Sequence, residues 1–177
     1  PIGQTFPTTH KQELLANAHS ETQRLLDLLG MRQGALNFDF VFSKEGELYF
    51  LELGPRNGGC RIPEVINYAT GVDLVKYTVD SALGLDCSSL SMREPIGFWA
   101  SYMVHAIKSG IYNRLEISER AKQCIVEQDI YAKPGMPVNM FSGSNDTLGE
   151  MILKFSEDEE MQEIISAMEK EIRVVVD

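Results

Sequence analysis

The stretch Gly34-Ala-Leu-Asn-Phe-Asp-Phe-Val-Phe42, followed by Glu47-Leu-Tyr-Phe-Leu-Glu-Leu-Gly-Pro-Arg-Asn-Gly-Gly59, decides the fold of its region. Both segments contain strand-forming apolar runs, and the polar turn Ser43-Lys-Glu-Gly-Glu47 separates them. Gly46 can take the positive φ that a tight hairpin needs. The pattern therefore predicts a β-hairpin, and we expect a two-residue loop formed by Glu45-Gly46.

The register of this hairpin brings two acids together. A two-residue loop pairs Lys44 with Glu47, and counting outward from that pair places Asp39 opposite Glu52. In this register one face carries Phe38, Phe40 and Phe42 opposite Leu53, Leu51 and Tyr49, and the other carries Asn37, Asp39 and Val41 opposite Gly54, Glu52 and Phe50. We predict that the first face packs into the core and that the second face carries the functional residues.

Opposed carboxylates repel each other across a strand pair, so the pairing of Asp39 with Glu52 needs a reason. A bound cation supplies one. Mg²⁺ typically takes one or two protein carboxylates together with waters and phosphate oxygens. The alternative is a one-residue slip or a longer loop, which would leave both acids merely solvated.

The segment after Glu52 has the outline of an anion site. It is rich in glycine, delivers Arg56 and opens a short helix near Pro63. The amides of Gly58 and Gly59 are unobstructed by Cβ atoms, helix N-termini favour anions, and a guanidinium can clamp a carboxylate or phosphate through two hydrogen bonds. Two carboxylates that can hold a metal ion, Asp39 and Glu52, next to such a loop indicate a phosphoryl-transfer site.

Residues 1–84 resemble the C-terminal half of an ATP-grasp ligase domain. The resemblance rests on the hairpin, the arginine loop and Tyr68-Ala-Thr-Gly-Val-Asp-Leu74 with its following helix. Relatives similar in this region include the carbamoyl-phosphate synthase large subunit, biotin carboxylase, glycinamide ribonucleotide synthetase and amino-acid ligases. The resemblance implies ATP and Mg²⁺, or Mn²⁺, as cofactors.

The resemblance also implies roles for individual residues. Asp39 and Glu52 match the two metal positions, and Arg56 matches the catalytic arginine that stabilises the acyl-phosphate. Asn37, Arg56, Asn57, Gly58 and Gly59 are the expected cofactor-binding residues. The family commonly has an asparagine where this chain has Gly54, and Asn37, which the register places opposite Gly54, could substitute for it.

Composition excludes several partners. The formal net charge of −10 argues against nucleic acid and anionic membranes, which select clustered Lys and Arg. No apolar run approaches the roughly 20 residues of a membrane-spanning helix. The three cysteines have no metal or pairing spacing. We expect a cytoplasmic enzyme whose substrates are a small-molecule carboxylate and a nucleophile. The sequence is also compatible with a homodimer.

The fold class expected is α+β, with an ATP-grasp lobe over residues 1–84 and a small β-rich module over residues 85–177. In the lobe, a capping box at Thr9-His-Lys-Gln12 predicts a helix that ends at Gly30, and Asp73 opens another that ends at Gly84 and buries Val75, Val79, Ala82 and Leu83. In the module, β-like runs cover residues 96–106, 110–117, 123–131 and 148–155. A last helix begins at Ser156, capped by Ser156 and Glu159, with Met161, Ile164, Ile165, Met168 and Ile172 as its buried stripe.

The function expected is that of the C-terminal part of an ATP- and Mg²⁺-dependent ligase. Such an enzyme forms an acyl-phosphate from a carboxylate, which an amine or other nucleophile attacks. Because the phosphate-binding loop and lysine of the family do not occur in this sequence, the chain alone is expected to be inactive. One alternative is a non-catalytic binding or dimerisation module in which Gly54 marks a decayed metal site. Another is an ATP-grasp enzyme that activates bicarbonate or carbamate.

Overall fold

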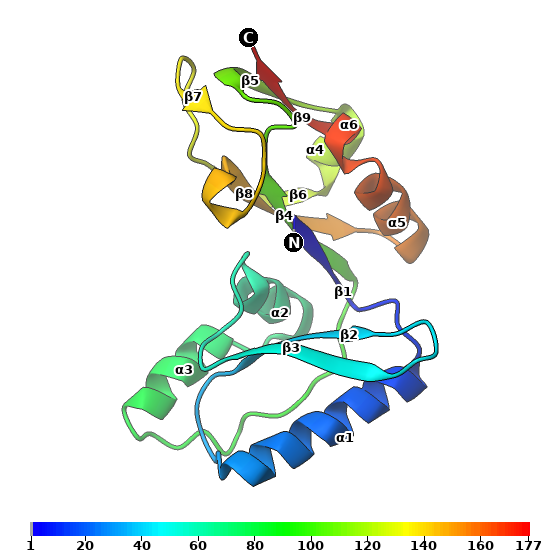
Figure 1. The fold of residues 1–177 in the computed structure, drawn as a ribbon, viewed down its shortest axis with the longest axis vertical. Helices are drawn as coiled ribbons and strands as arrows, with labels where there is room; N and C mark the ends of the chain where they lie inside the picture. The colour runs from blue at the N-terminus through cyan, green and yellow to red at the C-terminus, as the bar shows by residue number, and fades with distance from the viewer. Residues whose placement is uncertain (1) are drawn as a thin grey trace.

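The computed structural model describes residues 2–177. Figure 1 shows two parts with α2 between them. We call β1 together with residues 98–177 the sheet body, and α1, the β2–β3 hairpin and α3 the hairpin body. In chain order the elements are β1 (Gly3–Phe6), α1 (Gln12–Leu29), β2 (Asn37–Phe42), β3 (Leu48–Gly54), α2 (Ile62–Thr70), α3 (Leu74–Ala82), β4 (Phe98–Val104), β5 (Gly110–Ile117), α4 (Glu119–Cys124), β6 (Ile125–Ile130), β7 (Pro137–Val138), a 3₁₀ turn (Ser144–Asp146), β8 (Gly149–Phe155), α5 (Asp158–Ser166), α6 (Met168–Glu171) and β9 (Ile172–Val176).

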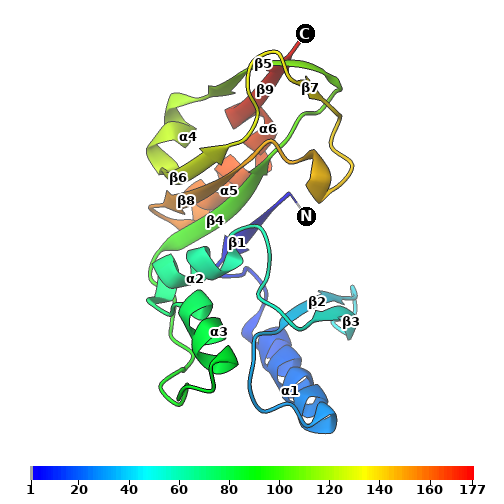
Figure 2. The same cartoon turned by 90° about the vertical axis from the view of Figure 1, so that its left-hand side faces the viewer.

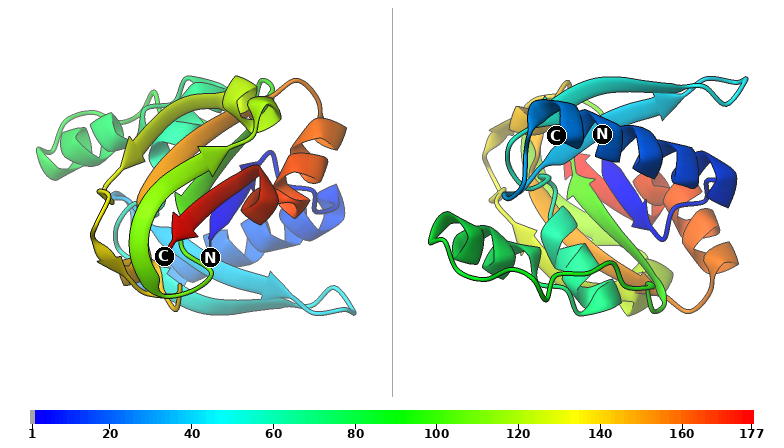
Figure 3. Two further views of the ribbon diagram at one scale, coloured as in Figure 1. Left: turned by 90° about the horizontal axis from the view of Figure 1, so that it is seen from above. Right: turned by 90° about the horizontal axis from the view of Figure 1, so that it is seen from below.

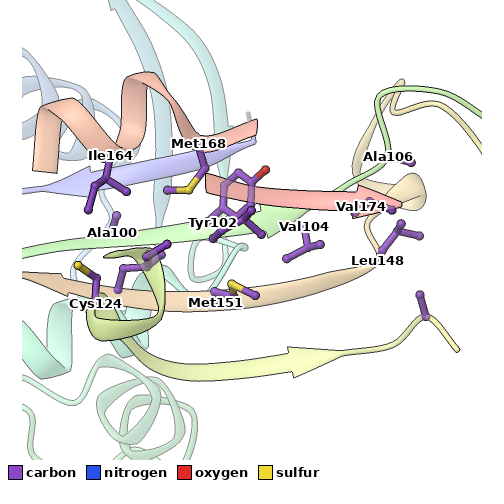
Figure 4. Packing of buried hydrophobic residues seen from close by; sticks show 14 of the residues in the cluster. Ala100, Tyr102, Val104, Ala106, Cys124, Leu148, Met151, Ile164, Met168 and Val174 are labelled. Carbon is purple, nitrogen blue, oxygen red and sulfur yellow. The ribbon is translucent and has the colours of Figure 1, made fainter. Parts of the chain in front are cut away.

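The sheet body is built on an antiparallel sheet in the order β1-β4-β8-β6, with a smaller sheet β7-β5-β9 beside it. Successive residues of β8 face opposite sides. Met151 and Leu153 enter a large cluster with Tyr102 and Ile164, while Ile152 packs on the other side in a smaller cluster. Figure 4 shows side chains of β4, β8, α5, α6 and β9 converging in the large cluster. Both faces of the central strands are therefore covered.

The first strand, β1, is separated in sequence from the rest of the sheet body but belongs to its sheet. β1 pairs with β4, so that Gly3 lies opposite Tyr102, and a Cβ on Gly3 would come within 2.7 Å of the Ser101 carbonyl oxygen. The smaller cluster brings Val65 and Ala69 of α2 against Trp99 and Ile152 of the sheet. Figure 2 shows α2 beneath this sheet. These contacts place the loop that precedes α2 next to the sheet body.

The hairpin of β2 and β3 pairs Asp39 with Glu52, as predicted, but through a different loop. The Ser43 amide donates to the Glu47 carbonyl at 2.8 Å and the Gly46 amide donates to the Ser43 carbonyl at 3.0 Å, so the loop has three residues. The expected two-residue loop and the pairing of Lys44 with Glu47 are wrong. The Ser43 hydroxyl accepts hydrogen bonds from the amides of Glu45 and Glu47, which favours the longer turn.

A β-bulge at Leu51 compensates for the extra loop residue. Phe40 lies opposite Phe50, whereas Asp39 keeps Glu52 as its partner. The expected pairs of Phe40 with Leu51, Val41 with Phe50 and Phe42 with Tyr49 are therefore wrong. Phe50 lies on the same face as Phe38, with ring centroids 5.8 Å apart. That face is only partly core, because Phe40 and Phe50 are each 36% exposed.

The helices of the hairpin body differ from expectation in their caps and burial. α1 begins after Lys11 without a side-chain cap, so the capping box is wrong, while Gly30 ends the helix in a left-handed conformation as predicted. Asp73 caps α3 and Gly84 follows it as predicted. The expected burial of Val75, Val79, Ala82 and Leu83 is wrong: Val75, Val79 and Leu83 are 50%, 53% and 68% exposed, and Ala82 is exposed as well. Figure 3 shows α1 running beside the hairpin and α3 projecting away from it.

The C-terminal segment contains more elements than the sequence pattern predicted. Four expected β-runs form β4, β5, β6 and β8, but β7, β9 and α4 were not expected. The single last helix is wrong: it breaks at Ala167 into α5 and α6, and Ile172 begins β9. The expected capping box at Ser156 is also wrong, since the Ser156 amide donates to Glu160 instead of Glu159. Among residues 2–177, no helix is both long and apolar enough to span a lipid bilayer.

Candidate active site

A cavity of about 550 Å³ lies between the hairpin, the loop after β3 and the sheet body. Its first wall comes from β2, the loop and the start of α2, and contains Asn37, Asp39, Arg56, Asn57, Gly59, Cys60 and Ile62. Its second wall comes from the sheet body and includes Gln4, Met103, Tyr131, Ser144, Thr147 and Glu150. The structure thus brings together most of the predicted site residues. Glu52 and Gly58 are not part of the lining.

The two acids of the hairpin occupy opposing positions on rigid strands. Asp39 lies directly opposite Glu52, and both residues are exposed. The Asn37 side-chain amide donates to Asp39 Oδ1 at 3.0 Å, which fixes the orientation of that carboxylate. Within residues 2–177 no group of three or more His, Cys, Asp or Glu side chains could hold a metal. Two opposed carboxylates are as many protein ligands as Mg²⁺ commonly takes, with water and phosphate oxygens as the others.

Arg56 is the one cationic side chain that residues 2–177 contribute to the cavity lining. Its side chain lies over Gly54, where a Cβ would be 3.6–3.7 Å from the Arg56 side-chain atoms. Nη1 donates to the Asn57 carbonyl at 2.8 Å, which directs the guanidinium along the loop. In the part of the chain that the structure describes, Arg56 makes no salt bridge. Most of its hydrogen-bond donors are therefore available to an anionic ligand.

The loop that precedes α2 has an unusual backbone. Cys60 and Arg61 take positive φ values of 54° and 59°, which is uncommon for residues other than glycine. A Cβ on Gly58 would come within 2.8 Å of the Asn37 side-chain oxygen, so glycine allows the loop to approach β2 closely. Over residues 2–177, the amides of Gly58 and Gly59 donate no hydrogen bond. These amides remain available to an anion.

Side chains from α2 and α3 hold this loop in place. The Asn57 side-chain amide donates to Thr78 Oγ1 at 2.8 Å, so this predicted cofactor contact also anchors the loop to α3. Arg61 and the Tyr68 hydroxyl both donate to Glu127 of β6. The hydrogen bonds from Tyr68 and Arg61 hold the pKa of Glu127 below its ordinary value. The loop is thereby tied to the sheet body as well as to the hairpin body.

Sequence reasoning missed the second wall of the cavity. Burial and the neighbouring Glu150 carboxylate raise the pKa of Tyr131. Thr147 Oγ1 is buried and has no hydrogen-bond partner within residues 2–177. Burial and Glu150 also raise the pKa of Cys60, which lines the cavity beside the loop. No local sequence signal marks Tyr131, Thr147 or Glu150, because only the pairing of β1 with β4 and the packing of α2 bring them to the hairpin. Cys60 differs, since it directly follows Gly59 in the predicted loop.

Comparison with curated proteins gives relatives of much greater length. No family model matches the chain. An uncharacterised protein of Sinorhizobium fredii, y4rH, is 27% identical over 84% of this chain and 31% of its own length. The carbamoyl phosphate synthase large chain of a Thermoanaerobacter species is 29% identical over 64% of this chain and 10% of its own length. The chain thus spans a third or less of these relatives.

Comparison with solved structures identifies the fold. The L-amino acid ligase of Bacillus licheniformis matches with a TM-score of 0.85 at 19% identity, over 99% of this chain and 44% of its own. Phosphoribosylglycinamide synthetase of Anaerococcus prevotii gives 0.78 at 22% identity, over 100% and 46%. The biotin carboxylase domain of Hydrogenobacter thermophilus 2-oxoglutarate carboxylase gives 0.69 at 17% identity, over 99% and 39%. These neighbours are ATP-grasp ligases, so the predicted fold is confirmed.

Proposed function

We propose that this chain forms part of an ATP- and Mg²⁺-dependent ligase that converts a carboxylate into an acyl-phosphate for attack by an amine or another nucleophile. One observation carries the proposal: Asp39, which lies opposite Glu52 on the hairpin, and Arg56, which has no salt-bridge partner within residues 2–177, line the same cavity of about 550 Å³. The fold supports it, and so does the Hydrogenobacter neighbour, which was crystallised with MgADP and bicarbonate.

Asp39 and Glu52 would hold the metal ion, Mg²⁺ or Mn²⁺. When bound, the ion neutralises charge on the ATP phosphates as the terminal phosphoryl group is transferred. Asn37 keeps one Asp39 oxygen occupied through a 3.0 Å hydrogen bond, which leaves the other oxygen for the ion. Gly54 provides no side chain here, so Asn37 is the neighbouring amide that can complete the set.

Arg56 and the loop amides would act on the anion that forms. The carboxylate substrate attacks the terminal phosphorus of ATP, and ADP leaves with the bridging electron pair. The nucleophile then bonds to the acyl carbon, and inorganic phosphate leaves as the carbon–oxygen bond breaks. An amine nucleophile releases a proton to water. Arg56 and the amides of Gly58 and Gly59 would stabilise the negative charge that develops on the acyl-phosphate and on its tetrahedral adduct.

Trapping with hydroxylamine tests the proposal. Acyl-phosphates react with hydroxylamine to give hydroxamates, which are detected by their iron complex or by mass spectrometry. The complete polypeptide that contains this chain is incubated with ATP, Mg²⁺, hydroxylamine and a panel of carboxylic acids. We expect one class of acid to give hydroxamate, and Glu52→Gln to abolish it at limiting Mg²⁺.

Glu116→Gln is the matched control, because Glu116 lies on β5 outside the cavity and pairs with Arg114 and Arg173. This substitution should leave hydroxamate formation unchanged. If no acid gives hydroxamate, or if both variants lose it equally, the acyl-phosphate mechanism is wrong. A non-catalytic module would give no hydroxamate with any acid but would still bind a partner.

A further inference from the structure

A chain of hydrogen bonds runs from Arg56 to α3. Arg56 Nη1 donates to the Asn57 carbonyl at 2.8 Å, and the Asn57 side-chain amide donates to Thr78 Oγ1 at 2.8 Å. The Thr78 hydroxyl donates in turn to the Leu74 carbonyl at 2.7 Å. We infer that Thr78 is a positioning residue of the proposed ligase, which sets the direction of the Arg56 guanidinium through Asn57. The inference rests on the proposed function and adds a residue of α3 to it.

Thr78 lies outside the candidate active site. Within residues 2–177, the lining of the cavity of about 550 Å³ includes Arg56 and Asn57 but not Thr78. A second hollow of about 370 Å³ is lined by Asn57, Thr78 and Leu74, together with residues of the segment before β2. Asn57 is thus shared by the two hollows, and Thr78 belongs only to the second. Thr78 can therefore act on the reaction through Asn57 and not by contact with the substrate.

The single proton of the threonine hydroxyl fixes the direction of these hydrogen bonds. Thr78 uses that proton for the Leu74 carbonyl, four residues earlier in α3. Its oxygen can therefore only accept from Asn57, which must turn its NH₂ group toward α3. The Asn57 side chain has one orientation as a result. The Asn57 backbone carbonyl, which accepts from Arg56, is restrained together with it.

The helix α3 gives this hydrogen bond a regular support. Leu74 and Thr78 both line the second hollow, and residues four apart lie one above the other on a helix face. Val79, on another face, is 53% exposed. Asp73 fixes the start of the helix, because its carboxylate accepts from the Lys76 amide at 2.8 Å. The Thr78 hydroxyl is therefore presented to the loop from a capped helix.

Arg56 needs such a support to act on charge that develops during the reaction. A long arginine side chain has many rotamers, whereas stabilisation of a transition state requires donors that are aligned beforehand. Arg56 makes no salt bridge within residues 2–177. Its hydrogen bond to the Asn57 carbonyl therefore directs the guanidinium. Without the Thr78 hydroxyl, that carbonyl would lose its anchor and Arg56 would be less well aligned.

Two substitutions of Thr78 in the complete polypeptide test the inference. Thr78→Val keeps the shape of the side chain and removes the hydroxyl, whereas Thr78→Ser keeps the hydroxyl. Hydroxamate formation is measured with ATP varied, at saturating Mg²⁺, hydroxylamine and the acid identified by trapping. We expect Thr78→Val to lower the maximal rate about 5-fold or more, the order of effect of one hydrogen bond, with the KM for ATP changing less than about 2-fold. Thr78→Ser should keep the wild-type rate.

Thr70→Val is the matched control. The Thr70 hydroxyl also donates to the carbonyl four residues earlier, that of Ile66, at 2.7 Å, but it accepts from the Val72 amide at 3.1 Å and not from Asn57. This variant makes the same chemical change away from Arg56 and should keep the maximal rate within about 2-fold. Equal losses in Thr70→Val and Thr78→Val would overturn the inference, as would a Thr78→Ser enzyme as slow as Thr78→Val.

The Arg56→Ala background separates positioning from a general loss of folded protein. It contains no guanidinium to direct, so Thr78→Val should lower the remaining rate less than about 2-fold. A merely structural contact would lower the rate by the same factor in both backgrounds, and that result would overturn the inference. Urea unfolding checks that each variant is folded. Thr78→Ala, which has the better helix propensity, takes the place of Thr78→Val in the same comparison if the valine variant does not fold.

The wild type distinguishes this inference from the proposed function. A wild type that forms hydroxamate, together with a Thr78→Val enzyme whose maximal rate lies within about 2-fold of it, would overturn the role of Thr78 alone. A wild type that forms no hydroxamate would remove the proposed function, and the role of Thr78 with it.

Discussion

The sheet body and the hairpin body differ in how completely their side chains are buried. Met151, Ile152 and Leu153 in the centre of the sheet body are fully buried, whereas Tyr49 and Leu51 of the hairpin are 52% and 65% exposed. The sheet is covered on both faces by segments of this chain, but the hairpin is covered only in part. The predicted metal and arginine residues lie on or after the less covered strands. Stability and chemistry therefore reside in different parts of the chain.

The largest expected contrast is in stability. Leu153→Ala removes a fully buried side chain from the sheet centre and should lower the free energy of unfolding by about 2–5 kcal/mol. Leu51→Ala, at an exposed bulge position, should lower it by less than about 0.5 kcal/mol. Urea unfolding followed by the fluorescence of the single tryptophan, Trp99, measures both. Equal losses would show that the hairpin carries as much of the core as the sheet.

A smaller effect is expected at the opposed acids of the hairpin. Asp39→Asn relieves charge repulsion with Glu52, so in the absence of metal it should be neutral or stabilise the protein by up to about 1 kcal/mol. The same variant should lose the Mg²⁺ dependence of hydroxamate formation. Urea unfolding in EDTA is the measurement. A clear destabilisation would mean that Asp39 acts mainly as the acceptor for Asn37.

The smallest effect concerns the contact that joins the loop to the sheet body. Hydrogen bonds from Tyr68 and Arg61 lower the pKa of Glu127 from its ordinary value of 4.5. A lowered pKa in the folded state gives stability that is present above pH 4.5 and is lost as pH falls through the lowered value. Because Glu127 is partly exposed, Glu127→Gln should cost at most about 1 kcal/mol at neutral pH.

The pH dependence of that difference is the test. The free energies of unfolding of the wild type and Glu127→Gln should converge below the lowered pKa, when Glu127 is protonated. Glu94 is exposed and makes no salt bridge among residues 2–177. The free energy of unfolding of Glu94→Gln should therefore equal that of the wild type already at neutral pH, and no convergence should be seen. A difference between wild type and Glu127→Gln that persists unchanged at low pH would assign the effect to packing.

The hairpin shows what sequence patterns can and cannot predict. Alternation of apolar residues predicted the two strands, and the expected two-residue loop, although wrong, predicted the pairing of Asp39 with Glu52. Neither pattern predicted the three-residue loop or the bulge at Leu51; each shifts the register by one, and their effects cancel at the acids. The Ser43 hydroxyl was the available signal for the longer loop.

Other failures have different physical causes. The apolar face of α3 was predicted to be buried, yet no segment within the described residues covers Val75 and Val79. The single last helix failed because a periodic stripe does not reveal where a helix gives way to a strand, as at Ile172. The second wall of the cavity depends on contacts between segments far apart in sequence, so Thr147 and Glu150 could not be found from spacing.

The central claim is that the hairpin and its loop act on the acyl-phosphate. Its most direct test is a kinetic series on Arg56→Ala in the complete polypeptide, with ATP, Mg²⁺ and the nucleophile varied. Arg24→Ala, on the exposed side of α1 in a pair with Glu21, is the control and should behave as wild type. We predict that Arg56→Ala lowers turnover about 100-fold or more while the KM for ATP changes much less. A raised KM for ATP with unchanged turnover would make Arg56 a ground-state phosphate anchor and would contradict the account.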